Sequence, residues 1–129
     1  MKKILVDSSV WIDYFGGHPG VEALSELLDN NRVCVNALIL SELLPFLKQK
    51  REDKLVSLLQ AVHRVPLNIE WDEIISMQCL NLKHGIHKVG IPDLIILQNA
   101  LQHHLEIFSL DKHFSLMKPL FKLHLVKLN

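Results

Sequence analysis

Cysteine is scarce in this sequence: the 129 residues include two, Cys34 and Cys79, and each lies in an apolar stretch. Small secreted domains held together by disulfides carry many more cysteines, so that class of protein is excluded. We expect two buried thiols in a reducing compartment, and therefore a cytoplasmic protein.

Long apolar runs are missing as well. The first run, residues 4–6, ends at Asp7 and is shorter than the roughly 7 to 15 residues that the core of a signal peptide needs. Later runs, such as residues 94–97, fall far short of the about 18 residues that span a bilayer. We therefore expect neither export nor a membrane partner.

An excess of charge of one sign is also missing, because 14 Lys and Arg residues balance 14 Asp and Glu residues. Proteins that coat nucleic acid along a broad basic face carry a net positive charge, so this class is disfavoured. A nucleic acid partner would have to be held locally. The hydrophobic share of 49% is enough for one core, and we expect a single domain over residues 1–129.

Short apolar runs alternate with segments of helical period along the chain. The runs predicted to be strands are residues 3–6, 32–35, 64–67, 106–110 and 123–128. The segments predicted to be helices are residues 10–15, 21–28, 36–46, 51–62, 71–83, 92–104 and 111–117. Pro45 lies inside the third of these helices, which therefore either kinks there or begins later. Because parallel strands need crossover helices on both faces of a sheet, this order predicts a three-layer α/β/α sandwich with a mostly parallel sheet of four to five strands.

Two acidic residues directly follow predicted strands, Asp7 after the first and Asp111 after a later one. Ligands of such folds bind at the carboxyl ends of the strands, so both acids project from the edge where a site is expected. Taken alone, each is more simply explained as the N-cap of the next helix.

Two further acids lie on apolar helix faces. Asp93 shares a face with Leu97, and Glu42 lies one turn from Leu38 on an apolar stripe, so both are expected to point inward. Buried carboxylates persist when they are paired with cations or bind a metal. None of the three arginines is placed at a predicted strand end, so pairing is a poor explanation; they are Arg32, Arg51 and Arg64.

Four converging carboxylates would need a cation. At about 4 Å each pair repels by about 4 kcal/mol at an effective dielectric constant of 20. All-oxygen ligand sets favour Mg²⁺ or Mn²⁺ over Zn²⁺, and such a site activates water for the cleavage of phosphodiesters.

Four ordered motifs carry a resemblance to a known family. They are Val6 to Phe15 (VDSSVWIDYF), Ser41 to Leu43 (SEL), Ile91 to Ile96 (IPDLII) and Phe108 to Phe114 (FSLDKHF). In this order they resemble the motifs of PIN-domain ribonucleases, in particular the small VapC-type toxins of bacterial and archaeal toxin–antitoxin pairs. The resemblance spans nearly the whole chain. It implies a Mg²⁺- or Mn²⁺-dependent endoribonuclease that a cognate antitoxin neutralises.

The resemblance also implies roles for particular residues. Asp7 and Asp93 match the principal metal ligands of the family, and Glu42 and Asp111 match the acids that complete the site and position metal or water. Ser8 matches a small hydroxyl residue that orients a carboxylate or a metal-bound water, although a plain helix cap explains it equally well. Pro45, close to Glu42, and the large apolar residues after Asp93 depart from the family pattern.

Partners are implied in the same way: an RNA substrate, a cognate antitoxin that lays a helix in an apolar groove near the first helices, and a homodimer or higher assembly with the antitoxin. The densest basic stretch, Lys48 to Lys54, is the best candidate for a phosphate track, although a solvated helix end explains it more simply. A zinc site built from His84 and His87 is disfavoured, and His113 is expected at the surface.

Other functions stay open at this point. A phosphoacceptor receiver domain would also bind Mg²⁺, but it needs an acidic pair where Ser8 and Ser9 follow Asp7. A phosphatase with Asp7 as nucleophile lacks a second acid at Ser9. A purely structural binding domain would require buried cations beside the acids.

Overall fold

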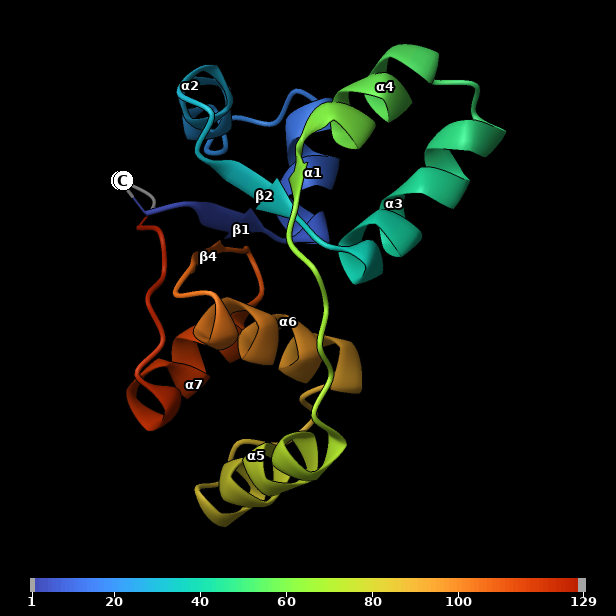
Figure 1. Ribbon diagram of the computed structural model, residues 1–129. Coiled ribbons are helices and arrows are strands. Elements are labelled where there is room, and N and C mark those ends of the chain that lie inside the picture. Colours follow the sequence, from blue (N-terminus) through green and yellow to red (C-terminus); the bar gives the residue numbers. More distant parts are fainter. Residues whose placement is uncertain (1, 128–129) are drawn as a thin grey trace.

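The computed structural model describes residues 2–127, which form a four-stranded sheet covered by seven helices (Figure 1). In chain order the elements are β1 (Ile4–Val6), α1 (Ser8–Phe15), α2 (Ala23–Asp29), β2 (Val33–Val35), α3 (Ala37–Gln49), α4 (Asp53–Ala61), β3 (His63–Arg64), α5 (Trp71–Lys83), α6 (Ile91–Gln102), β4 (Glu106–Phe108) and α7 (Lys112–Phe121).

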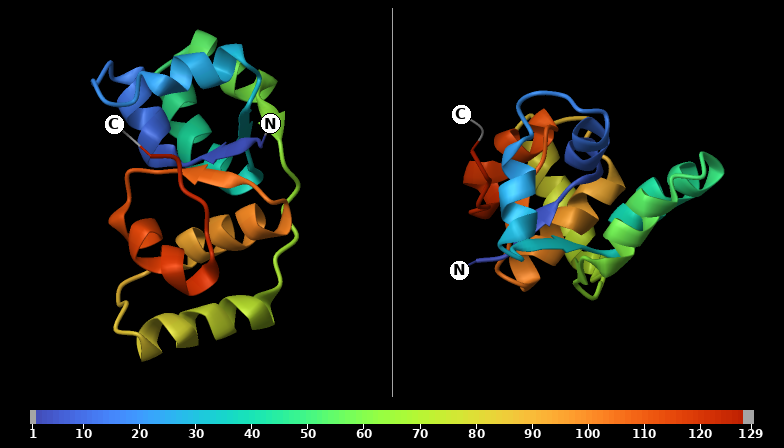
Figure 2. Two further views of the ribbon diagram at one scale, coloured as in Figure 1. Left: turned by 90° about the vertical axis from the view of Figure 1, so that its left-hand side faces the viewer. Right: turned by 90° about the horizontal axis from the view of Figure 1, so that it is seen from above.

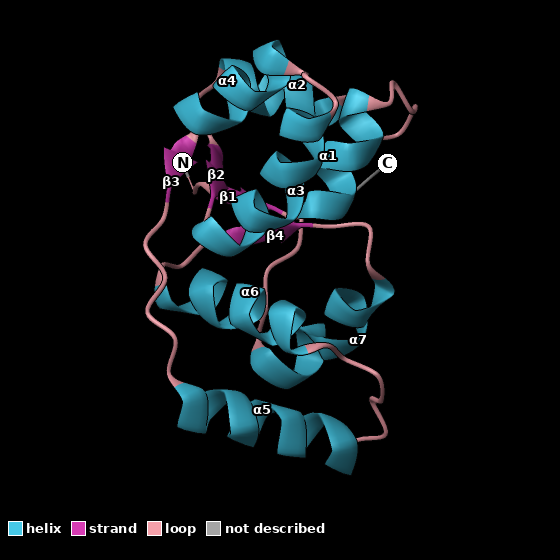
Figure 3. Ribbon diagram, turned by 90° about the vertical axis from the view of Figure 1, so that its right-hand side faces the viewer, coloured by secondary structure: helices cyan, strands magenta, loops and turns pink. Residues whose placement is uncertain are grey.

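The sheet is parallel throughout, and its strand order is β3-β2-β1-β4. Helices α1 to α4 lie on one face; α6 and α7 lie on the other, with α5 outside α6 (Figure 3). This arrangement confirms the predicted three-layer α/β/α sandwich. The α3–α4 pair extends beyond the rest of the fold, as the right-hand view of Figure 2 shows. Among residues 2–127, none of the helices is both long and apolar enough to cross a membrane.

The central strands are apolar because both of their faces are covered. Every residue of β1 and β2 is buried, as expected for strands of a parallel sheet between two helical layers. The chain leaves β1 at Asp7, which caps α1, and leaves β2 at Asn36, whose side chain accepts the Ile39 N–H and caps α3. The carboxyl ends of adjacent strands thus lead directly into helix N-termini.

Helix α6 is buried over most of its surface. Residues 94–100 are all buried, because this helix lies between the sheet and α5 (Figure 3). A helix enclosed on opposite sides needs no polar stripe, which accounts for the large apolar residues that follow Asp93.

Several predicted boundaries are wrong. Strand β3 covers residues 63–64 rather than 64–67, and it ends just before Pro66, which has no N–H for a ladder. Helix α7 continues four residues beyond the predicted end, through Phe121. Helix α3 runs through Pro45 to Gln49 without a break in its assignment.

The predicted last strand is reduced to one parallel bridge, between Ile107 and Leu125, and Leu128 lies outside the described residues. The thiols also differ from expectation: Cys34 is buried but Cys79 is exposed on α5, and neither forms a disulfide.

Candidate metal-binding site

Asp7 is the most buried acid of the candidate site, with 5% of its surface exposed. It follows β1 and caps α1, so the capping interpretation is correct for this residue. Its Oδ1 accepts the Ser8 N–H at 2.8 Å, and its Oδ2 accepts the hydroxyls of Ser109 at 2.7 Å and Ser9 at 3.2 Å. These bonds fix the orientation of the carboxylate, so that capping and ligand binding are compatible roles.

Two serines join the turn after β1 to the turn after β4. The Ser109 Oγ, which donates to Asp7, also accepts the Asp111 N–H at 3.0 Å. The Ser9 Oγ accepts the Leu110 N–H at 3.1 Å. Sequence reasoning assigned no role to Ser9 or Ser109, although each lies two residues from a predicted site acid.

Asp93, Asp111 and His113 lie together at the same edge of the sheet. One ligand atom from each lies within 4.8 Å of the others, and all three residues are half-buried. Asp93 comes from the first turn of α6, Asp111 caps α7, and His113 lies in the first turn of α7. The expectation that His113 is a surface residue is wrong, because its side chain is 19% exposed and its Nδ1 lies 3.1 Å from Asp111 Oδ1.

The electrostatics of Asp93 reflect this crowding. The pKa of Asp93 is raised to about 6, chiefly by burial and then by the nearby charges of Asp111 and Asp7, while His113 opposes this shift. A carboxyl that resists ionisation among other carboxylates is the behaviour expected where a cation is needed to balance them.

Glu42 differs from its prediction. Its residue surface is exposed on α3, so it does not lie on a buried stripe. Desolvation still raises the pKa of its carboxyl, as does the charge of Asp7, and a hydrogen bond from Ser8 lowers it. The residue as a whole is thus exposed, while its carboxyl group is close enough to Asp7 and Ser8 to be affected by both. Glu42 therefore lies at the open rim of the Asp7 site.

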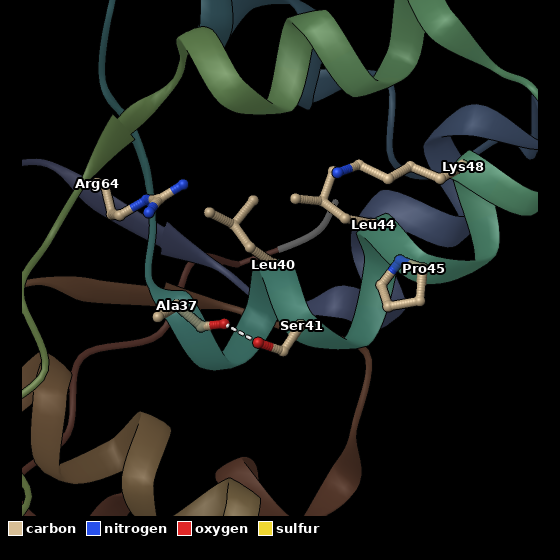
Figure 4. Close-up of a pocket in the computed structure, with 7 residues that line it drawn as sticks. All are labelled: Ala37, Leu40, Ser41, Leu44, Pro45, Lys48 and Arg64. Carbon is tan, nitrogen blue, oxygen red and sulfur yellow. Dashed lines mark hydrogen bonds between the residues drawn. The ribbon is translucent and has the colours of Figure 1, made fainter.

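Basic side chains do not neutralise this cluster. Among residues 2–127, the one contact between a basic side chain and an acid runs from His113 Nδ1 to Asp111 Oδ1, which is an ion pair only when the imidazole is protonated, and no lysine or arginine pairs with an acid. Arg64 does end a strand, contrary to expectation, but it lines a hollow of about 310 Å³ on α3 together with Ser41 and Lys48 (Figure 4). The alternative of a purely structural domain, which required buried cations beside the acids, finds no support in the described part of the chain.

The residues present fit a divalent cation. Three carboxylates from separate elements and the rim acid Glu42 supply oxygen donors, and His113 Nδ1 is shut off from solvent without a hydrogen-bond partner. His84 and His87 belong to no group of potential ligands within residues 2–127.

Comparison with known proteins identifies the family. The PIN domain family matches residues 4–118. This chain belongs to the PIN domain family. No curated protein sequence matches the chain.

Solved structures of similar fold cover nearly the whole chain, and one of them is described as a toxin–antitoxin complex. VapBC2 from Rickettsia felis, bound to a DNA fragment from its promoter, has 14% identity and a TM-score of 0.73, with 98% of each chain covered. A toxin–antitoxin complex from Klebsiella pneumoniae has 19% identity and a TM-score of 0.69, with 97% of each covered. FitAcB from Neisseria gonorrhoeae has 19% identity and a TM-score of 0.69, with 96% of each covered. At these identities the likeness shows that this PIN domain shares their fold.

Proposed function

We propose that this PIN domain is a Mg²⁺- or Mn²⁺-dependent endoribonuclease and serves as the toxin of a toxin–antitoxin pair in the cytoplasm. The observation that carries the proposal is the convergence of Asp7, Asp93 and Asp111 at one edge of the sheet without a basic partner. PIN domains are generally nucleases, which favours this function over a receiver domain or a phosphatase.

The side chains of the proposed site have different roles. Asp7, Asp93 and Asp111 would hold the ion, with Glu42 at the rim to position water, and Ser8 orients the Glu42 carboxyl. An ion held there would supply Lewis-acid chemistry, lowering the pKa of water and neutralising charge on the scissile phosphate. Ser109 and Ser9 keep the Asp7 carboxylate in one orientation, so that little rearrangement is needed when the substrate arrives.

The hollow on α3 is a candidate path for the RNA backbone. Its lining includes the cations Arg64 and Lys48, the hydroxyl of Ser41 and no acid (Figure 4). Helix α3 carries both Ser41 of this hollow and the rim acid Glu42. A guanidinium and an ammonium there would bind phosphates locally, which suits a protein with no net charge.

An antitoxin is the second proposed partner. The structural neighbour from Klebsiella pneumoniae is a toxin–antitoxin complex. On this chain Ile12 of α1 is 60% exposed, and an apolar hollow between α2 and α4 includes Leu28 and Leu58. These features support the docking of an amphipathic helix beside the first helices, within a homodimer or a larger assembly.

The test is cleavage of structured and unstructured RNAs by the purified protein with Mg²⁺, with Mn²⁺ and with EDTA. We expect metal-dependent cleavage that Asp7→Asn and Asp93→Asn reduce by at least about a hundredfold, since each removes a ligand charge. Asp72→Asn, an exposed acid on α5, is the matched control and retains wild-type turnover. Wild-type turnover in Asp93→Asn at the same Mg²⁺ concentration would overturn the assignment.

A further inference from the structure

His113 has a buried ring nitrogen whose chemistry the proposed carboxylate site leaves unused. Its Nδ1 is shut off from solvent and lies 3.1 Å from Asp111 Oδ1, yet the contact lacks the geometry of a hydrogen bond. A buried polar atom without a partner is costly, and such atoms are rare in folded proteins. We therefore expect this nitrogen to bind a group other than Asp111 in the functional protein.

The position of the ring follows from the start of α7. Asp111 caps this helix by accepting the His113 N–H at 2.9 Å, which holds the backbone of the histidine beside the carboxylate. Phe114, the next residue, and Met117, one turn further along, are buried in the core and fix the rotation of the helix. The imidazole is thus held towards the acids by the cap and by packing.

The same edge holds a complete set of three donors. A ring nitrogen of His113 and one oxygen each from Asp93 and Asp111 lie within 4.8 Å of one another, a spacing that lets one ion contact all three. No other such group of His, Cys, Asp and Glu occurs in the part of the chain that the structure describes.

We propose that His113 is a direct nitrogen ligand of the ion held by Asp93 and Asp111, and that it makes the site prefer a first-row transition-metal ion over Mg²⁺. Imidazole is a good ligand for transition metals, whereas Mg²⁺ takes oxygen ligands and retains several waters. This inference rests on the proposed function in that both place an ion among these carboxylates, but it does not require RNA cleavage. The alternative is that His113 only supports Asp111 from outside the coordination sphere.

Mn²⁺ is a suitable probe because its electron paramagnetic resonance reports its ligands directly. Pulsed spectra of the full chain with one equivalent of Mn²⁺ and no RNA are expected to show modulation from a coordinated ¹⁴N nucleus. In protein that carries ¹⁵N-labelled histidine, the modulation changes to that of ¹⁵N. This second measurement needs no substitution, so it stands whether or not a variant folds.

Substitution then assigns the ligand to one histidine. His113→Gln is expected to lose the nitrogen modulation, and the matched control His87→Gln, an exposed loop residue, is expected to keep it. Calorimetry is expected to show that the wild type binds Mn²⁺ at least about tenfold more tightly than Mg²⁺. In His113→Gln, the ratio of the two dissociation constants is expected to fall to about three or less.

The outcomes separate this inference from the proposed function. Bound Mn²⁺ without nitrogen modulation, or an unchanged ratio in His113→Gln, would overturn the role of His113 even if RNA is cleaved. Nitrogen modulation in a protein that cleaves no RNA would leave the ligand assignment standing and count against the nuclease. Failure to bind Mn²⁺ at all would overturn both.

Discussion

At the scale of single residues, Asp93 is the acid in which the crowding of the site is most evident. Its pKa is raised from 3.8 to about 6, first by burial and then by the charges of Asp111 and Asp7. In the unfolded chain this carboxyl has an ordinary pKa, so between about pH 4 and 6 the folded state binds more protons than the unfolded state. The free energy of unfolding therefore falls as the pH rises through this window.

This difference predicts a pH-dependent effect of Asp93→Asn in the absence of metal. At pH 7.5 in EDTA, the variant is expected to be more stable than the wild type by about 1 to 2 kcal/mol, because a repelled charge is removed and solvent screens part of the full shift. Near pH 4 the two proteins should unfold at the same denaturant concentration. Urea titrations at both pH values measure this, and an equal difference at both would contradict the shifted pKa.

At the scale of elements, buried amides connect the ends of the sheet to α6. Asn36 Nδ2 donates to Asn99 Oδ1 at 2.9 Å, and Asn99 Nδ2 donates to the Pro66 carbonyl at 3.0 Å. The Asn36 Oδ1 accepts the Ile39 N–H and so caps α3. One side chain thereby joins the helix that carries Glu42 to the helix that carries Asp93.

Asn36→Ala is expected to lower the free energy of unfolding by about 2 to 4 kcal/mol, since it removes the cap of α3 and leaves Asn99 Oδ1 buried without a donor. The exposed residue Asn68 is the control, and Asn68→Ala should change stability by less than about 0.5 kcal/mol. Chemical denaturation measures both. A cost for Asn36→Ala close to that of the control would show that water replaces the lost bonds.

At the scale of the whole molecule, the charges balance but are not evenly placed. The acids of the proposed metal site gather at the carboxyl edge of the sheet, and a separate hollow on α3 is lined by Arg64 and Lys48 without an acid. A protein of zero net charge attracts RNA weakly from a distance, so the proposed substrate is bound through a few local phosphate contacts.

The salt dependence of RNA binding follows from this arrangement. RNA binding is measured in the Asp93→Asn variant, which is not expected to cleave the RNA. For single-stranded RNA, a plot of the logarithm of the association constant against the logarithm of the salt concentration is expected to have a slope of about −2. Adding Arg64→Gln should reduce the magnitude of this slope by about 0.7. Lys83→Gln, at the end of α5, should leave the slope unchanged. Fluorescence anisotropy across KCl concentrations measures it, and a slope steeper than about −4 would indicate a broad basic face instead.

The sequence by itself determined the layers of the fold and the edge where the site lies. Alternating apolar runs and helical periods require parallel strands with crossover helices, and the acids that follow β1 and β4 must then meet at the carboxyl edge. Interactions between residues close in sequence are enough to predict such features, and the helix caps at Asp7 and Asn36 are examples. The roles of Asp7, Glu42, Asp93 and Asp111 as metal ligands stay predictions.

Only the tertiary structure decided which side chains meet across the chain. The bond from Ser109 to Asp7 joins residues 102 positions apart, and no local period encodes such a contact. Likewise the burial of His113 depends on how α7 packs, and the exposure of Glu42 depends on which face of α3 the sheet covers. Propensity and periodicity describe one element at a time, whereas the distances that define a site are set by the packing of several.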